Sequence, residues 1–492
     1  MSGTFDDTYR QVIPRWLDYE MSCYLGLLRT KGKLVYPSGF PTRYSQAALD
    51  WQSNPTIITA ADLVAEKLIF KDFEAKQSRD AAIFILDNAP ESARLVRDLA
   101  EHFLNEPTFS EEIIKTNYSR EYARACIATL KRSVRSHPLN PVAWSDLSLC
   151  YAMLGHIEKA QRSMQVALVL GKQNRFILRS ATRCFFHAGD PKRAVDYLRQ
   201  SNMCNSDPWI AAAEIAISDG TQLRSTCIKA GWSLVENMNI SPFAKSELAA
   251  ALCTMEAKSG SQRKVKKLVK QALVDPSENA LAQVEWLASQ KYTKPPPETK
   301  TPASYEAESR HYYREKQFDQ SLIATEQWAR FQLFSSQPLI QAMFISSVCL
   351  NNDPQSISMV ESASPTHRKN PLVINNLAFA LARQGKIKAA TEELKNVDRG
   401  NLKKREMLAI LATQGLICFR SGETDKGREL YNRAVLGFDH ICDNRSAAIA
   451  AFFWAFEEKR AHCREASACI ANAKKRVKKF EVFEIEDAAN AL

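Results

Sequence analysis

The chain contains 492 residues, more than one hydrophobic core of ordinary size accommodates, which predicts either several domains or an array of repeats. Apolar residues make up 45% of the chain and charged residues 25%, so a wholly disordered polymer and a collagen-like fibre are excluded. The formal net charge of +11 favours an acidic partner, whether an acidic peptide, a nucleic acid or a membrane surface. Only 16 glycines and 20 prolines interrupt the chain, which favours long helices with short turns over a sandwich or a barrel.

The compartment is predicted from the cysteines and the apolar patterns. Twelve cysteines are scattered without a C-x-x-C pair, and Cys150, Cys184, Cys253 and Cys418 fall inside apolar helical patterns typical of buried, reduced thiols. The first residues are acidic, and they lack the positively charged region followed by an apolar stretch that a secretory signal has. No apolar run approaches the ~18 residues that a membrane helix needs. We therefore expect a cytoplasmic protein without a membrane span.

Residues 1–135 are predicted to form an N-terminal helical region with divergent helix pairs and an extended arm. The stretch Ala60–Asn88 has apolar residues at helical spacing in two halves, which predicts one such pair. Residues 30–57 contain the turn-rich stretches YPSGFPTRY and WQSNPT, so we expect a loop or an extended arm there.

An internal repeat follows this region. Two consecutive stretches align at an offset of 34 residues, which places Gly155 on Gly189 and Ala160 on Ala194. Apolar residues recur three and four positions apart in both halves of each stretch, so each predicts two amphipathic helices. The glycine ends the first helix because it adopts the left-handed conformation without a Cβ clash, and the alanine allows the two helices to approach closely.

Further copies recur along the chain at a similar interval. Two degenerate copies are predicted near residues 209–234 and 339–361, because the turn positions around them lie about two repeat lengths apart. The other copies are recognised by their turn residue, which is Gly260 in the copy 246–272, Lys316 in the copy 305–328, Gly385 in the copy from residue 370 and Gly422 in the copy after it.

The register of the repeats breaks once. Gly260 and Lys316 are 56 residues apart, which is no whole number of repeats, and the break contains the proline-rich run KYTKPPPETKTP. Its three consecutive prolines predict a semi-rigid linker. The domains expected are the N-terminal region 1–135, a first lobe 136–290, the linker 291–304, a second lobe 305–445, and C-terminal capping helices 446–492 with a basic tract and an acidic tail.

The repeated pattern of bulky residue, leucine, aromatic residue, glycine and alanine at a period of 34 resembles the tetratricopeptide repeat family. The match is strongest at residues 140–201 and 370–434. The resemblance implies an all-α fold, a right-handed α-solenoid of antiparallel helix pairs, in which stacked copies bury apolar faces that one pair leaves open. Departures from the pattern predict local irregularity, and they are Lys316 at a turn, Gly427 in place of alanine, and Ser148 and Thr182 in place of a smaller residue.

Motifs for catalysis are not found. The sequence contains no phosphate-binding loop, no dinucleotide fingerprint, no H-E-x-x-H and no G-x-S-x-G. The eight histidines are never four apart on a helix, so no zinc pair is expected. Arg132 with His137 and Arg433 with His440 fit a loose ribonuclease spacing, but chance alone gives two such matches. We therefore expect no catalytic residue, metal, cofactor or small-molecule substrate, and a dispersed Cys–His pair is the one enzyme reading left open.

In arrays of this kind the first helix of each pair lines the concave surface, and residues three and four apart share its inner face. One slot, two residues before the turn, is basic or histidine in five of six copies. Two interpretations stay open, because cations in the last helical turn also complement the helix dipole, whereas a basic ladder with aromatic neighbours binds carboxylates or phosphates. The predicted partner-binding groove consists of Arg179, Arg183, Phe186, His187, Arg310, Tyr313, Arg314, Asn375, Phe379, Arg383, Phe419 and Arg420.

Two function hypotheses follow. The leading one is a non-enzymatic scaffold or adaptor that binds a partner protein, with an acidic segment, through this basic groove within a multi-protein complex. The alternative is a nucleic-acid-binding sensor or regulatory subunit of a separately encoded effector. The basic tracts Arg263–Lys270 and Lys474–Lys479 fit this alternative, although each equally fits a solvated helix face.

Overall fold

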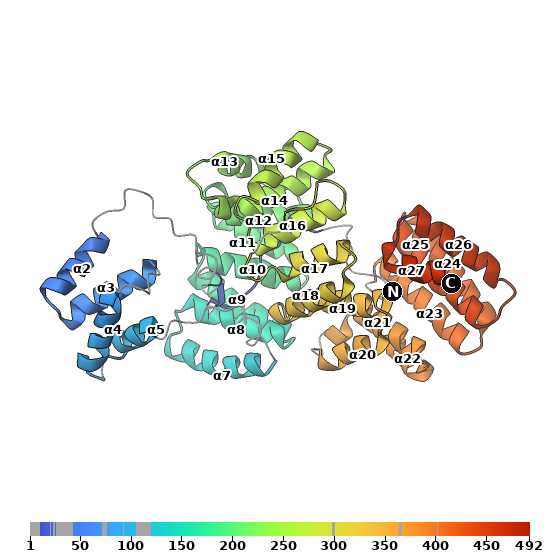
Figure 1. Cartoon of the computed structure of the whole chain (residues 1–492), viewed down its shortest axis with the longest axis horizontal. Helices are drawn as coiled ribbons and strands as arrows, with labels where there is room; N and C mark the ends of the chain where they lie inside the picture. The colour runs from blue at the N-terminus through green and yellow to red at the C-terminus, as the bar shows by residue number, and fades with distance from the viewer. Residues whose placement is uncertain are drawn as a thin grey trace. The chain divides into compact units, whose positions relative to one another are not determined.

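The computed structural model describes residues 10–19, 21–22, 25, 43–70, 76–91, 93–104, 120–297, 301–363, 367–400 and 402–492. Helices are the regular elements of these ranges, and no strand occurs within them (Figure 1). The chain forms two compact units, one of residues 1–19 with 115–492 and one of residues 20–114. None of the helices in these ranges is long and apolar enough to cross a bilayer.

The smaller unit contains α2 (Arg43–Ser53), α3 (Ile57–Phe70), α4 (Lys76–Asn88) and α5 (Arg94–Leu104). The helix pair expected over Ala60–Asn88 is present as α3 and α4, and its core includes Leu63, Ile85 and Phe103. The loop expected over residues 30–57 is wrong for 43–53, which form α2. Trp51 of α2 packs edge-on against Phe84 of α4 at 5.1 Å, a tertiary contact that the local turn signals do not reveal. Residues 26–42 lie outside the described residues.

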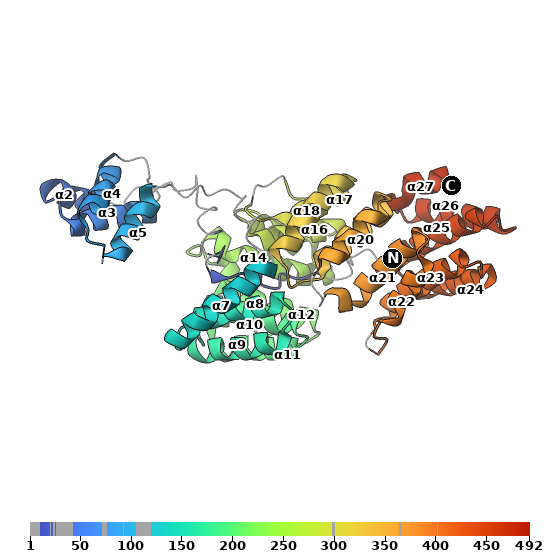
Figure 2. The same cartoon turned by 90° about the horizontal axis from the view of Figure 1, so that it is seen from below.

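The larger unit is an array of consecutive antiparallel helix pairs, which succeed one another in chain order (Figure 2). The predicted all-α fold of stacked helix pairs is therefore confirmed. Its helices are α7 (Arg120–Ser136), α8 (Pro141–Met153), α9 (Ile157–Leu170), α10 (Arg175–His187), α11 (Pro191–Gln200), α12 (Pro208–Gly220), α13 (Ile228–Glu236), α14 (Pro242–Lys258), α15 (Gln262–Ala272), α16 (Glu278–Ser289), α17 (Tyr305–Arg314), α18 (Phe318–Phe331), α19 (Gln337–Phe344), α20 (Asp353–Ser362), α21 (Pro371–Arg383), α22 (Ile387–Lys395), α23 (Lys404–Arg420), α24 (Thr424–His440), α25 (Asn444–Arg460), α26 (Ala466–Lys479) and α27 (Glu486–Ala491).

Local chemistry sets the ends of these helices. Asn140 precedes α8, and its side-chain oxygen accepts a hydrogen bond from the backbone nitrogen of Val142, while Pro141 occupies the first helical position with its preset φ. The turns inside the pairs have the expected left-handed residue, with φ of 78° at Gly155 and 79° at Gly189. Lys316 adopts the same conformation, with φ of 60°, although its Cβ makes that conformation less favourable.

Helix pairs cross most closely where the sequence supplies its smallest residues. Ala160 and Ala194 are each only 1% exposed. Gly427, which departs from the repeat pattern, marks a still closer crossing of α23 and α24. A Cβ there would lie 2.6 Å from a ring carbon of Phe419 and 3.0 Å from the carbonyl oxygen of Gly415, so the backbones are too close for alanine.

Helix pairs occupy both regions where degenerate copies are predicted, α12 with α13 and α19 with α20. The break in register contains one additional helix, α16, which packs against α14 and α17. The positions of the lobe and linker boundaries remain predictions. Residues 279–288 of α16 are all buried, including the polar side chains of Asn279, Gln283 and Glu285. Buried polar groups require hydrogen-bonding partners, and the partners of these groups define the candidate site.

The C-terminal residues fold back onto the array. The helix pair expected between Arg445 and Phe480 is present as α25 and α26. After α26, the buried carboxylate of Glu484 accepts hydrogen bonds from the hydroxyl of Tyr313 at 2.7 Å and from Nε of Arg445 at 2.7 Å. The acidic tail thus binds residues of α17 and α25, and its position is set by contacts distant in sequence.

Candidate protein-binding groove

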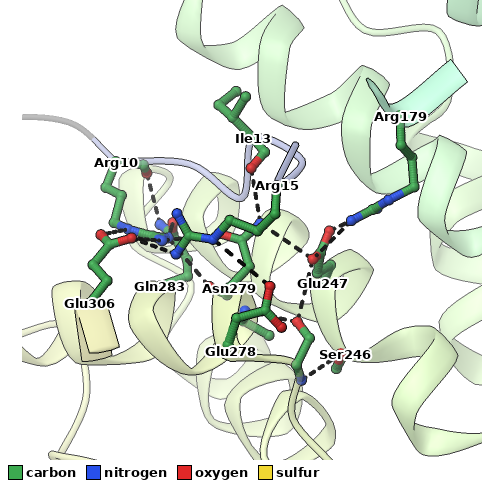
Figure 3. A network of polar contacts seen from close by, with 12 residues as sticks. Arg10, Ile13, Arg15, Arg179, Ser246, Glu247, Glu278, Asn279, Gln283 and Glu306 are labelled. Carbon is green, nitrogen blue, oxygen red and sulfur yellow. Dashed lines mark hydrogen bonds and ion pairs between the residues drawn. The ribbon is translucent and has the colours of Figure 1, made fainter. Parts of the chain in front are cut away.

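Residues 10–18 of the larger unit lie against its helix array without forming a helix or a strand. They are nevertheless packed as tightly as a core element, because Val12 is fully buried and Trp16 is only 1% exposed. Apart from a bond from the backbone nitrogen of Ile13 to the carbonyl oxygen of Gln11 at 2.7 Å, the backbone groups of this segment make their hydrogen bonds with the surface that it covers. Figure 3 shows that these bonds come mainly from α16 and α17.

Helix α16 binds the backbone of this segment through two side-chain amides. Nδ2 of Asn279 donates to the carbonyl oxygen of Ile13 at 3.0 Å, and Nε2 of Gln283 donates to the carbonyl oxygen of Arg10 at 2.8 Å. The two amides are four residues apart and therefore lie on one face of the helix. Such bonds recognise a main chain whatever its side chains, as a peptide-binding surface does.

Glu306 of α17 binds both arginines of the segment. Its carboxylate oxygens accept from Nε and Nη2 of Arg10 at 2.7 and 2.9 Å, and from Nη2 of Arg15 at 2.6 Å. Arg310, one turn along α17, donates to the same carboxylate at 3.1 Å. Burial alone would raise the pKa of Glu306, but the charges of Arg10, Arg15 and Arg310 hold this pKa well below its ordinary value. The carboxylate is therefore ionised throughout the neutral range.

Helices on either side complete the groove. Asp219, near the end of α12, accepts from Nε2 of Gln11 at 2.8 Å. Trp16 packs against Phe334 with ring centroids 5.4 Å apart, and Tyr19 packs edge-on against Phe176 of α10 at 5.3 Å. The surface contacted by residues 10–19 therefore extends over α8, α10, α12, α16 and α17 and includes Phe334, which follows α18, and we call this surface the α10–α17 groove.

The predicted basic residues are largely neutralised by carboxylates of the chain itself. Four of these pairs join different helices, two of them successive in the chain, and the three arginines in the slot before the turn, Arg314, Arg383 and Arg420, each pair with a carboxylate of another helix. Whether these residues also bind an acidic partner remains a prediction. The pairs are Arg179 with Glu247, Arg310 with Glu306, Arg314 with Glu285, Arg383 with Asp353 and Arg420 with Glu457.

Arg183 differs from these arginines, because no ion pair with a described residue is found for it. Its guanidinium lies over the rings of Phe334 and Phe186, 5.3 and 5.9 Å from their centroids. Burial, together with the charge of Arg15, lowers the pKa of Arg183 to about 9. His187, one turn further along α10, contacts Phe334, and burial and the charge of Arg183 lower its pKa to about 4. Both residues thus contact Phe334, against which Trp16 of the docked segment packs.

The other predicted groove residues are part of the packed interior. Tyr313 is buried by the C-terminal tail. Asn375 is completely buried, and Phe379 packs edge-on against Phe453 at 4.9 Å. Phe419 belongs to the same core. Arg310 donates to the carboxylate that binds the segment, and Arg183 and His187 contact Phe334, against which Trp16 packs, while Phe186 lies under the guanidinium of Arg183. Arg179 pairs with Glu247, which also accepts from Asn279. Tyr313 and Arg314 share α17 with Arg310, whereas Asn375, Phe379 and Arg383 lie on α21 and Phe419 and Arg420 on α23.

Sequence reasoning missed the acidic and amide residues that contact the segment. Their signal was present, because α16 carries three polar residues, Asn279, Gln283 and Glu285, in the buried stretch 279–288, which is otherwise apolar. Polar residues on a helix that is apolar all round indicate a buried polar partner. The complementary signal is a pair of arginines, Arg10 and Arg15, that enclose apolar residues near the start of the chain.

Each basic tract is partly paired, and each keeps exposed lysines, Lys266 and Lys270 on α15 among them, while Arg476 of α26 pairs with Asp439 at 2.8 Å. In α15, Lys264 pairs with Glu256 at 3.0 Å and Lys267 pairs with Glu236 at 2.7 Å. In α26, Lys475, Lys478 and Lys479 are exposed. In the part of the chain that the structure describes, no cluster of three potential metal ligands occurs, and the eleven cysteines there are free thiols.

Comparison with known proteins gives similarity only to solved structures. No family model and no curated protein matches the chain. The APC/C hetero-tetramer Cut9–Hcn1 is 12% identical with a TM-score of 0.37, covering 91% of this chain and 99% of that one. Yeast Tom70 is 12% identical with a TM-score of 0.32, covering 88% and 96%. Naa15/Naa10 bound to HypK-THB is 14% identical with a TM-score of 0.25, covering 88% and 80%. The fold assignment therefore rests on the helices and turns of this chain.

Proposed function

We propose that this protein is a non-enzymatic scaffold of the cytoplasm that binds an extended segment of a partner protein in the α10–α17 groove. The observation that carries the proposal is that this groove already holds an extended segment, residues 10–18, through amides that bind its main chain and a carboxylate that binds its arginines. A helix-pair array with such a groove is suited to hold a partner within a larger assembly.

The polarity of the groove favours a partner segment with basic residues. Glu306 and Glu278 both face Arg15 of the docked segment, with shortest distances of 2.6 and 3.9 Å. One residue in this region still supports the acidic partner predicted from the sequence. This residue is Arg183, whose charge is not paired with a described carboxylate. A single partner segment with basic residues and one acidic residue beside Arg183 satisfies both observations.

Peptide selection tests the proposed function. Arg10→Glu with Arg15→Glu places two like charges beside Glu306 and opens the groove; we call this chain the opened variant. The blocked variant adds Asn279→Leu and Gln283→Leu, which remove the two amides that bind the main chain. We expect peptides from a random 12-residue library to bind the opened variant with micromolar Kd and to lose at least tenfold in affinity on the blocked variant. Failure to enrich any peptide, or equal binding to both variants, would contradict the proposal.

The second candidate function, nucleic-acid binding, is favoured by the exposed cations of α26. Lys475, Lys478 and Lys479 lie on its solvent-exposed side, where they are accessible to phosphates. Substitution of all three by glutamate, compared with Lys266→Glu and Lys270→Glu on α15, tests this function by RNA and DNA binding at two salt concentrations. Affinity that falls only with the α26 substitutions and decreases steeply with salt would support it.

A further inference from the structure

We infer that residues 10–18 are an intramolecular competitor for the groove, and that the partner segment is basic and extended, with two arginines that enclose apolar residues and an aromatic residue after the second. This inference rests on the proposed function and adds the chemistry of the ligand and the regulation of the site. In this chain the pattern is Arg10, then Val12 and Ile13, then Arg15 followed by Trp16.

The first argument is that the segment is held as a bound peptide is held. Its described residues up to Asp18 adopt no regular structure, and its backbone carbonyls accept hydrogen bonds from Asn279 and Gln283, which are more than 260 residues away in the sequence. Its order therefore comes from the groove and not from local structure. A segment of another chain that makes the same contacts would therefore bind this surface in the same way.

The second argument is charge complementarity. Arg10 fits between three groups of the groove, with Nη1 donating to Oε1 of Gln283 at 2.6 Å and Nη2 donating to Oδ1 of Asn279 at 3.0 Å and to Glu306 at 2.9 Å. A planar guanidinium satisfies this set of acceptors better than an ammonium does, because its donors are fixed in one plane. The groove therefore selects arginine at this position of the ligand.

The third argument concerns Glu306, whose carboxylate is 5% exposed and binds Arg10, Arg15 and Arg310. When the segment leaves, the carboxylate of Glu306 is bound only by Arg310 and becomes exposed to water. The groove then loses most of its charge-assisted hydrogen bonds. An arginine-containing partner restores them. A neutral or acidic partner does not, and this difference gives the groove its specificity.

Tethering sets the magnitude of the competition. A segment joined to the chain that holds its site has an effective concentration on the order of 1 mM. If the free peptide has a Kd on the order of 1 μM, its apparent Kd for the wild-type chain rises to about 1 mM, because it must displace the tethered copy. The wild-type groove is therefore closed to weak or dilute ligands, and a partner binds only when it exceeds the tethered segment in affinity or local concentration.

The test uses a fluorescein-labelled peptide with the sequence of residues 8–19, TYRQVIPRWLDY, titrated with full-length chains and followed by anisotropy. A control peptide carries glutamate in place of both arginines. We expect the peptide to bind the opened variant at least tenfold more tightly than the wild type, the blocked variant to lose this binding, and the control peptide to bind no chain. Trp16→Ala, with helix content checked by circular dichroism, provides a second way to weaken the tethered segment if the opened variant does not fold.

Equal binding of the peptide to the wild type and to the opened variant would overturn the inference. The absence of binding to both the opened variant and the Trp16→Ala chain would overturn it too. So would a wild-type dimer, found by light scattering, that exchanges N-terminal segments between differently tagged copies, because the occupant would then be a second copy. The inference can also fail while the proposed function stands. This is the outcome if the opened variant selects library peptides of another chemistry but does not bind this peptide.

Discussion

Glu306→Gln removes one negative charge and leaves the shape of the side chain almost unchanged. In the native chain this carboxylate, 5% exposed, binds Arg10 and Arg15 of the segment and Arg310 of its own helix. The substitution therefore leaves three mostly buried guanidinium groups without their shared anion. Breaking a buried ion pair by removing one partner typically costs about 3–5 kcal/mol. Because most of the lost contacts join the segment to the groove, we expect this cost to favour undocking of residues 10–18 over unfolding of the array.

Limited trypsin digestion measures this undocking directly, because trypsin cleaves after Arg10 and Arg15 only when the segment leaves the groove. When opening and closing are faster than cleavage, the rate follows the population of the open form. A cost of about 3 kcal/mol corresponds to a rate about 100-fold higher, since ~1.4 kcal/mol changes an equilibrium tenfold. Glu308→Gln on the exposed face of the same helix is the matched control and leaves the rate within about twofold of the wild type. Equal cleavage of the Glu306→Gln and wild-type chains would refute the assigned role of Glu306.

Three further outcomes are expected. Arg420→Glu places two carboxylates together against buried Glu457 and destabilises the array by about 3–5 kcal/mol in urea unfolding; unchanged stability would mean that the pair is not formed. Gly427→Leu overpacks the close crossing of α23 and α24 and costs about 1–3 kcal/mol, whereas Lys426→Leu at the exposed neighbour stays within about 0.5 kcal/mol. His187 has a pKa lowered to about 4, so it stabilises the fold above the unfolded value of about 6.5 and this contribution is lost as the pH falls towards 4; His187→Gln therefore reduces the loss of stability in urea unfolding between about pH 6.5 and 4, and an unaltered loss would contradict the assignment.

The fold was largely predictable because its information is local and repeated. The turn glycines, the small residues at helix crossings and the period of 34 residues each reflect contacts within one helix pair. The repeat does not reveal the extra helix α16, because a single helix has no second copy with which to align. The helix α2 was missed because its anchor, Trp51 on Phe84, joins two helices separated by turn-like sequence.

The candidate site was less predictable because its contacts are long-range. Arg10 and Glu306 are 296 residues apart, and no local periodicity connects them. The basic slot was found correctly as a sequence pattern, but the sequence does not show that a carboxylate faces most of its arginines. One signal was available, because Arg420 and Glu457 are separated by 37 residues, the interval between neighbouring copies in that part of the chain. A search for opposite charges one repeat apart would have identified this pair as a connection between repeats.

Photo-crosslinking from residue 16 tests the central claim most directly. With p-benzoylphenylalanine in place of Trp16, irradiation of the full-length chain should join residue 16 to the peptide that contains Phe334, whose ring lies 5.4 Å from that of Trp16 in the native chain. Excess peptide of residues 8–19 should reduce this product when Arg10→Glu is also present. Crosslinks that map outside the α10–α17 groove, or none within the chain, would contradict the claim that this groove binds an extended segment.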